Sequence, residues 1–256
     1  MTDLHMHSRF SDGRDSPEDM VEEGIRKGLT LIGISDHSYV ESDESSMPRE
    51  SLNAYLQEMK RLKEKYAGVI EIRCGLERDY YSDLDTGFDY VIGSVHWISM
   101  KDGHRLAVDW TPERLEEDCR KYFEGDWYAL AEAYYHLEED VVRKTACDII
   151  GHFDLVTKFN EQAGWFDPQH PRYRAAWQKA AQILLRTGKP FEINTGAISR
   201  GYRTDAYPSR EIRSFLWEHG ARLILSSDAH QKENIAFEFE RFQSEICCCD
   251  SATNVI

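Results

Sequence analysis

Short apolar runs alternate with amphipathic segments along most of the chain, an order typical of repeated strand–helix units with a parallel sheet. The runs are mostly uninterrupted rather than alternating, as expected for strands that are covered on both faces. Candidate strands of this kind lie at residues 3–8, 29–37, 69–79, 88–97, 147–154, 190–196 and 222–230. The pattern therefore predicts an α/β protein.

The segments between these runs carry clear helix start and stop signals. Ser16 is a candidate N-cap, Pro17 suits the first helical position and Gly28 can end the helix. Further helices are predicted where similar signals recur, with one opening at Thr111 and Pro112 and two lying over residues 171–187 and 208–219. Because strands and helices alternate throughout, we expect a single barrel domain over residues 1–256.

Composition narrows the possible partners. The chain has 46 acidic and 31 basic residues, a formal net charge of −15, which argues against nucleic acid or an anionic membrane surface as a partner. No apolar run is long enough for a membrane span, and no signal peptide precedes the first strand, so we expect a cytoplasmic protein. The six cysteines show no CxxC spacing, and we expect no role for the triplet Cys247, Cys248 and Cys249.

Histidines gather at the ends of the predicted strands. Six of the ten follow an apolar run or lie in the first one, at His5, His7, His37, His96, His152 and His230. Acidic residues accompany them at Asp12, Glu77 and Asp228, with Glu77 placed just beyond its apolar run. The carboxyl ends of parallel strands meet on one face of a barrel, where active sites of this architecture lie.

These nine side chains are candidate metal ligands. A lone histidine after a strand is more often a loop or core residue, but chance would scatter histidines over helices as well. Imidazole and carboxylate are ligands of Zn, Mn and Fe. Nine ligands exceed the needs of one ion, so we expect two or three divalent ions.

The motifs DLHMHS, SDH, GLE, GSVH, GHFD and SSDAH, in this order, resemble the polymerase and histidinol phosphatase (PHP) family over nearly the whole chain. The EINTG segment, followed by a loop with arginines and by YPS, is most similar to the histidinol-phosphatase branch. The resemblance implies a distorted (β/α)7 barrel with its active site at the carboxyl ends of the strands. It also implies the hydrolysis of L-histidinol phosphate to L-histidinol in histidine biosynthesis.

The resemblance further implies how the metals are shared, with Glu77 as a bridging ligand. The first metal would be held by His5, His7, Glu77 and Asp228. The second would be held by Asp12, His37 and His230, and the third by Glu77, His96 and His152. Asp12 is the most variable of these positions among relatives.

A metal-bridging hydroxide would attack phosphorus in line, without a covalent intermediate. Three divalent ions, three carboxylates and the hydroxide leave roughly two positive charges, which match a phosphate monoester dianion better than a diester. We assign catalytic roles to Asp228, His230, Arg200 and Arg203, with Asp228 orienting the nucleophile.

The substrate would be a small phosphate ester. Arg200, Arg203 and Lys158 are candidate phosphate-binding residues, because guanidinium and ammonium groups pair with phosphate. Candidates for the organic part of the substrate are Glu41, Glu44, Trp97 and Glu117. His104 is expected to lie outside the site.

Three alternatives stay open at this stage. Amidohydrolases also begin with an HxH strand, but they usually supply a bridging lysine where this chain has Glu77. A metal-binding module without catalysis would be expected to have lost ligands, and none is missing here. Hydrolysis of small phosphodiesters or nucleotides would use the same metal site. The sequence leaves the oligomeric state open.

Overall fold

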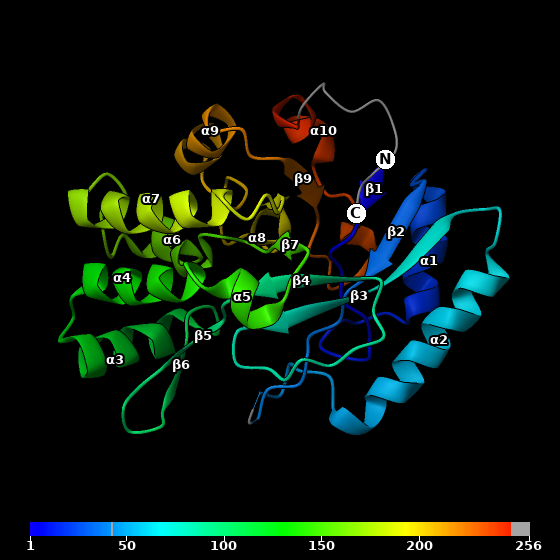
Figure 1. The fold of residues 1–256 in the computed structure, drawn as a ribbon, viewed down its shortest axis with the longest axis horizontal. Helices are drawn as coiled ribbons and strands as arrows, with labels where there is room; N and C mark the ends of the chain where they lie inside the picture. The colour runs from blue at the N-terminus through cyan, green and yellow to red at the C-terminus, as the bar shows by residue number, and fades with distance from the viewer. Residues whose placement is uncertain (42, 247–256) are drawn as a thin grey trace.

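Seven parallel strands form the central sheet of the computed structural model, which describes residues 1–41 and 43–246. The strand order is β1-β2-β3-β4-β7-β8-β9 (Figure 1). Their bounds are β1 Thr2–Asp3, β2 Leu31–Ile34, β3 Glu71–Asp79, β4 Tyr90–Ser94, β7 Ile149–Ile150, β8 Phe191–Asn194 and β9 Leu223–Ser226. A separate antiparallel pair consists of β5 Trp97–Ser99 and β6 Arg105–Ala107.

The first and last strands of the sheet meet just beyond their carboxyl ends. Met6 and Ala229 form a parallel bridge, and the backbone N–H of His7 donates to the Ala229 carbonyl at 2.9 Å. The sheet is therefore a nearly closed barrel, which confirms the predicted distorted (β/α)7 architecture. Closure at this end draws the carboxyl ends of the strands toward one another.

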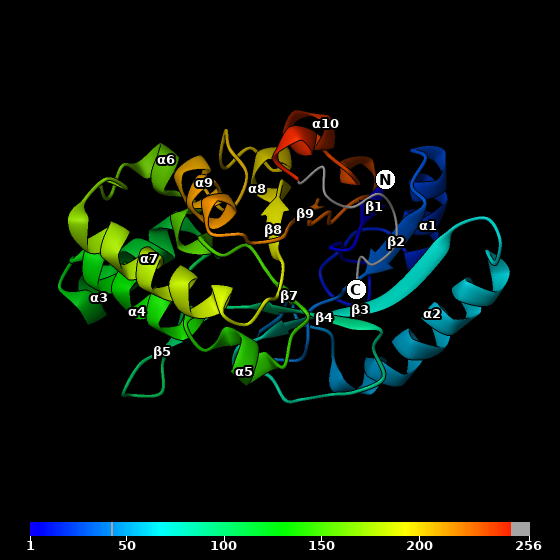
Figure 2. The same cartoon turned by 45° about the horizontal axis from the view of Figure 1, so that its top comes forward.

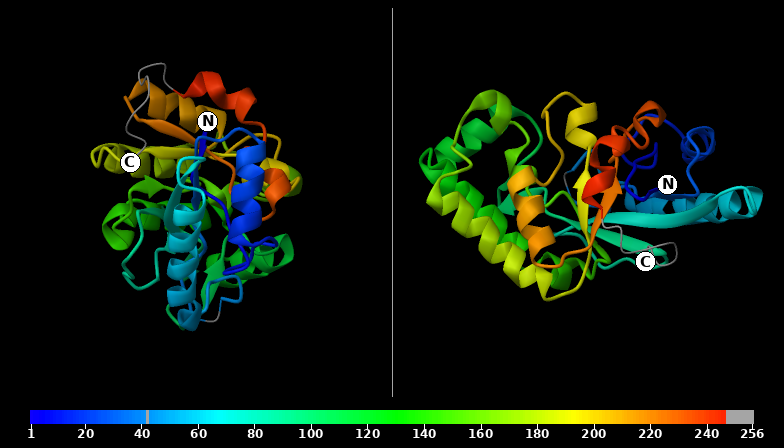
Figure 3. Two further views of the ribbon diagram at one scale, coloured as in Figure 1. Left: turned by 90° about the vertical axis from the view of Figure 1, so that its right-hand side faces the viewer. Right: turned by 90° about the horizontal axis from the view of Figure 1, so that it is seen from above.

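Helices flank the barrel on two sides. The N-terminal helices α1 and α2 lie beside the first strands, whereas α3, α4 and α7 form a second group on the opposite side, as Figures 1 and 2 and the view from above in Figure 3 show. Their bounds are α1 Pro17–Arg26, α2 Leu52–Lys65, α3 Pro112–Phe123, α4 Trp127–Glu138, α5 Val141–Thr145, α6 Asn160–Ala163, α7 Pro171–Leu185, α8 Gly196–Ser199, α9 Arg210–Glu218 and α10 Phe239–Phe242. Short 3-10 turns lie at Arg49–Ser51, Leu155–Thr157, Lys232–Asn234 and Gln243–Glu245.

The predicted helix signals are present with one correction. Ser16 caps α1 because its hydroxyl oxygen accepts from the Asp19 N–H, and the Asp19 carboxylate accepts in turn from the Ser16 backbone N–H. The helix predicted over 208–219 begins at Arg210 instead. Ser209 has an extended backbone (φ −55°, ψ 155°), and its N–H donates to Asp154 at 2.8 Å rather than starting a helix.

Two irregular connections distort the barrel. The described residues between β3 and β4, 80–89, form no helix. After β4 the chain forms the β5–β6 hairpin before the helices α3, α4 and α5 lead to β7. This hairpin extends beyond the carboxyl end of β4 and forms one wall of the pocket described below.

The side chain of Tyr90 packs across the first strands of the barrel. A Cβ atom at Gly75 or at Gly33 would meet the Tyr90 phenol at 2.2 Å, so the neighbouring strands need glycine at these positions. The hydroxyl donates to the Leu4 carbonyl. Tyr90 therefore joins β4 to the residue that follows β1, across β3 and β2.

Candidate metal centre

His5 and His7 leave the end of β1 on the same side of an extended segment. Side chains two apart on an extended chain share a face, and the intervening Met6 points instead into the apolar core. Both histidines are fully buried. Their Nε2 atoms lie 3.2 Å and 3.4 Å from Oε2 of Glu77.

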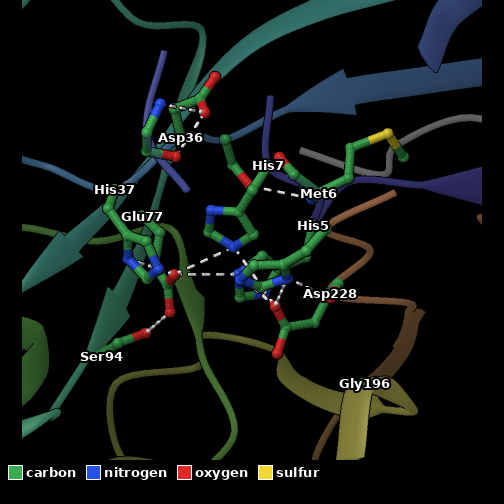
Figure 4. A network of polar contacts seen from close by, with 12 residues as sticks. His5, Met6, His7, Asp36, His37, Glu77, Ser94, Gly196 and Asp228 are labelled. Carbon is green, nitrogen blue, oxygen red and sulfur yellow. Dashed lines mark hydrogen bonds and ion pairs between the residues drawn. The ribbon is translucent and has the colours of Figure 1, made fainter. Parts of the chain in front are cut away.

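Glu77 is the centre of the cluster. It lies inside β3 rather than just beyond the apolar run, because β3 continues to Asp79. Its Oε2 lies 3.0 Å from His37 Nδ1, while Oε1 lies 2.8 Å from His152 Nε2 and 3.4 Å from His96 Nε2. Oε1 also accepts from the Ser94 hydroxyl at 2.7 Å (Figure 4). The two oxygens thus face ligands from opposite parts of the barrel.

Asp12 reaches the cluster through a tight turn after β1. Asp36 holds this turn by accepting from both the backbone N–H and the hydroxyl of Ser8 and of Ser11. A Cβ atom at Gly13 would lie 2.3 Å from the His7 carbonyl oxygen, so the turn requires glycine there. These contacts place Asp12 Oδ2 at 3.1 Å from His230 Nε2.

Asp228, the second residue after β9, adopts a left-handed backbone conformation with φ of 49°. Its Oδ1 lies 3.3 Å from His7 Nε2 and 3.8 Å from His5 Nε2. Its Oδ2 accepts from Nη2 of Arg200 at 3.0 Å. Gly196 allows this approach, because a Cβ atom there would lie 2.8 Å from the Asp228 side chain.

The structure brings all nine predicted ligands into one region, with a grouping that differs in part from that implied by the resemblance. In the described part of the chain, three sets have ligand atoms within 4.8 Å of one another: His7, Asp12, His37 and His230; His5, His7 and Asp228; and His37, Glu77 and His96. His7 and His37 thus each belong to two sets. His152 contacts the cluster through Oε1 of Glu77.

Several buried atoms of the cluster have no hydrogen-bond partner among the described residues. They are His5 Nε2, both ring nitrogens of His7, Glu77 Oε2 and His152 Nδ1. Leaving a buried polar atom unsatisfied costs about 1–3 kcal/mol. Neutral ring nitrogens and carboxylate oxygens that converge without partners are suited to divalent metal ions, so this donor set fits the expected metals.

Neighbouring histidines differ in their affinity for protons. Burial opposes a charge on His37, but the carboxylates of Glu77 and Asp12 outweigh it and raise the pKa of His37 to about 9. Burial, together with the nearby His230 and His37, lowers the pKa of His7 to about 3. The cluster therefore holds protons at some ligand positions when no metal is bound, and these protons compete with metal.

A pocket of about 450 Å³ opens beside the cluster. Arg200 and Lys158 line it, as do Trp97, Asp109 and Trp110 from the hairpin side. The Lys158 ammonium donates to the Asp109 carbonyl at 2.7 Å and lies 3.3 Å from the Asp109 carboxylate. The pocket therefore combines candidate metal ligands with cations, aromatic rings and acidic groups.

Arg203 is not positioned as the sequence predicted. It is buried, and its Nη1 donates to Thr157 at 2.8 Å and to Asp154 at 3.3 Å, outside the lining of the pocket. The buried Asp154 carboxylate forms an ion pair with the Arg203 guanidinium. Arg203 is therefore an ion-pair partner of Asp154, and the structure does not bring it to the pocket lining where phosphate binding was predicted.

The remaining predicted positions divide clearly. Glu44 and Trp97 line the pocket, whereas Glu41 and Glu117 do not. His104 lies outside it, with Nε2 at 3.0 Å from Asp118. The triplet Cys247, Cys248 and Cys249 lies outside the described residues.

Sequence reasoning missed four pocket or support residues: Asp79, Asp109, Trp110 and Glu192. Glu192 is the one for which the sequence carried a signal. A glutamate within the apolar run of β8 is buried with 1% exposure, and such a charge needs a partner inside the barrel. Asp109 and Trp110 follow a hairpin whose course could not be read from the sequence pattern.

Comparison with known proteins places this chain among relatives of one family. The family model of the PHP domain matches residues 3–196. A Deinococcus radiodurans protein named "Probable histidinol-phosphatase" is 29% identical over 262 residues, covering 96% of this chain and 92% of that protein.

Two solved structures share the fold. HisK from Listeria monocytogenes superposes with a TM-score of 0.84 at 20% identity, covering 94% of this chain and 100% of that chain. Histidinol phosphate phosphatase from Lactococcus lactis, in complex with Zn, L-histidinol and phosphate, superposes with a TM-score of 0.72 at 24% identity, covering 96% and 92%. Within the described residues there is no helix with the length and apolar character needed to cross a membrane. From the match of the family model over most of its length, the chain belongs to the PHP domain family.

Proposed function

We propose that this chain is a metal-dependent phosphomonoesterase that hydrolyses L-histidinol phosphate to L-histidinol and phosphate, a reaction of histidine biosynthesis. One observation carries the proposal. The two oxygens of the buried Glu77 face five histidines from four different segments, and Arg200 and Lys158 line the pocket beside them. The names of the relatives and the ligands in the Lactococcus lactis structure support the choice of substrate.

The nine clustered side chains would hold two or three divalent ions, with Zn, Mn and Fe as candidates. When bound, the ions would supply hydroxide near neutral pH and positive charge opposite the phosphoryl oxygens. The protein contributes the placement. Glu77 contacts histidines from all three ligand sets. Asp228 lies next to His5 and His7, where it can orient the attacking water and accept its proton.

Arg200 is the candidate phosphate-binding arginine. Its Nη2 is held at 3.0 Å from Asp228 Oδ2 and its Nη1 at 2.8 Å from His230 Nδ1, so the guanidinium lies directly against two candidate metal ligands. Its Nε has no partner among the described residues. A phosphate drawn to the metals would therefore meet a guanidinium already fixed in place, with Lys158 as the second cation in the lining.

The outer part of the pocket suits the organic half of L-histidinol phosphate, which carries an amine and an imidazole. Trp110 is 59% exposed and packs edge-on against Trp97, with ring centroids 6.2 Å apart. Asp109 and Glu44 add carboxylates to the same pocket. Aromatic faces and carboxylates attract cations, so this wall would favour a cationic ester over a neutral one.

The experiment that tests the proposal is phosphate release by purified, metal-analysed protein from L-histidinol phosphate, an aryl phosphate and an aryl phosphodiester. We expect the highest kcat/KM for L-histidinol phosphate, with activity lost on chelation and restored by Zn or Mn. If the diester is turned over equally fast or faster, the metal centre remains supported but the assignment of L-histidinol phosphate as the substrate is rejected. Activity that survives complete removal of metal would overturn the mechanism.

A further inference from the structure

Two buried carboxylates outside the ligand set contact candidate metal-ligating histidines from behind. Glu192 lies on β8 and Asp79 ends β3, and both are nearly inaccessible to solvent. Each faces the Nδ1 atom of one histidine whose Nε2 points toward Glu77. The two carboxylates therefore lie where they can decide which ring nitrogen is free to bind a metal.

Glu192 fixes His5. Its Oε1 lies 2.7 Å from His5 Nδ1, and its Oε2 accepts from the His152 backbone N–H at 3.1 Å and from Asn194 Nδ2 at 3.2 Å. On the other side of the ring, His5 Nε2 lies 3.2 Å from Glu77 Oε2 and has no hydrogen-bond partner in the described part of the chain. Glu192 thus holds the segment after β7 and the His5 ring in one network.

Asp79 has the corresponding relation to His96. Its Oδ2 lies 3.3 Å from His96 Nδ1 and accepts from the His96 backbone N–H at 3.1 Å. Its Oδ1 accepts from the Tyr81 N–H at 2.8 Å, which fixes the carboxylate itself. His96 Nε2 then lies 3.4 Å from Glu77 Oε1.

We propose that Glu192 and Asp79 are positioning residues, which keep His5 and His96 in the Nδ1–H tautomer and direct their Nε2 lone pairs into two different metal positions. A histidine that binds metal through one nitrogen keeps its proton on the other, and a carboxylate behind it fixes both tautomer and ring orientation. His5 clusters with His7 and Asp228, whereas His96 clusters with His37 and Glu77. The inference rests on the metal centre of the proposed function.

The test compares Glu192→Gln and Asp79→Asn in the full-length chain, with Glu138→Gln as the matched control. Glu138 is also a glutamate with 1% exposure, but it accepts from the Tyr134 hydroxyl at 2.8 Å instead of facing a ligand histidine. Zinc stoichiometry and dissociation constants are measured by chelator competition, after circular dichroism has shown that each metal-free variant is folded. We expect each site variant to weaken one zinc position about 10- to 100-fold.

The control separates positioning from general damage to the barrel. Glu138→Gln is expected to keep all zinc affinities within about twofold, and an equal loss in this variant would overturn the specific role of Glu192 and Asp79. Unchanged zinc binding by both folded site variants would also overturn it. Weakening of the same single position by both variants would refute the assignment to two positions.

A second measurement needs no variant. Long-range proton–nitrogen NMR spectra of the zinc-loaded parent chain should show His5 and His96 protonated at Nδ1, and protonation at Nε2 would refute the proposal. Failure of the proposed function gives a different result. The parent chain could show these tautomers and zinc affinities and still fail to hydrolyse L-histidinol phosphate. That result would support the positioning roles and reject the substrate assignment.

Discussion

His37 Nδ1 lies 3.0 Å from Oε2 of Glu77, the same oxygen that faces His5 and His7. Without metal, the carboxylates of Glu77 and Asp12 overcome the effect of burial and raise the pKa of His37 to about 9. Glu77 itself is buried, which alone would raise its pKa, but the surrounding histidines hold that pKa well below its usual value. In the metal-free protein, protons therefore supply the positive charge that metals would bring.

Metal affinity should consequently rise with pH. At neutral pH His37 carries a proton that must leave before the ring can bind metal, and the proton is lost only as pH approaches about 9. We expect the apparent zinc affinity to increase about tenfold per pH unit between pH 7 and 8 for each such proton. Calorimetry in buffers of different ionisation enthalpy measures the protons released. Zinc binding without proton release would contradict the raised pKa of His37.

Removal of the central carboxylate should affect metal and turnover together. In Glu77→Ala, the candidate metal positions beside the surrounding histidines lose their carboxylate oxygens, so we expect reduced metal content and kcat/KM lower by at least about 10²-fold. Metal analysis and phosphate release on the same preparation measure both effects.

His104→Ala is the control for Glu77→Ala. His104 contacts Asp118 outside the pocket, and we expect near-parent metal content and activity. Full activity of Glu77→Ala would contradict the shared-ligand role. Loss of activity in His104→Ala would show that the site extends beyond the pocket.

The barrel architecture and the clustering of the candidate ligands could be predicted because both follow from local pattern. His37, His152 and Asp228 each follow a short apolar run, and parallel strands bring such positions to one end of the barrel. Whether Arg200 or Arg203 enters the pocket could not be predicted, because the two lie three residues apart in the same loop. The choice depends on Asp154, which is distant in sequence and binds Arg203.

This division between the two arginines gives a paired prediction. Arg200→Ala should lower kcat for L-histidinol phosphate by about 10²- to 10³-fold, because a fixed donor opposite the phosphoryl group is lost. The metal-free protein should lose less stability than Arg203→Ala does, since Arg200 is partly exposed and Asp228 keeps His7 and His230 as neighbours. Kinetics at saturating zinc and thermal unfolding provide the two readouts.

Arg203→Ala should show the reverse. It leaves the Asp154 carboxylate buried without its charged partner, which typically costs 3–5 kcal/mol of folding free energy, about the scale we expect here. Turnover per folded molecule should change little. A variant of Arg203 that is stable but inactive would place this arginine back in the site.

The wall formed by Trp97 and Trp110 should distinguish substrates rather than drive the chemistry. Trp110 is 59% exposed, so Trp110→Ala removes little packing and should leave unfolding and metal content unchanged. A cation lying over an indole gains about 1–2 kcal/mol, so we expect kcat/KM for L-histidinol phosphate to fall about 5- to 30-fold. A small neutral alkyl phosphate, which has no cation for the indole to bind, should react at the parent rate. Equal losses for both esters would mean that Trp110 shapes the metal pocket itself, whereas no loss for either would place the organic half of the substrate elsewhere.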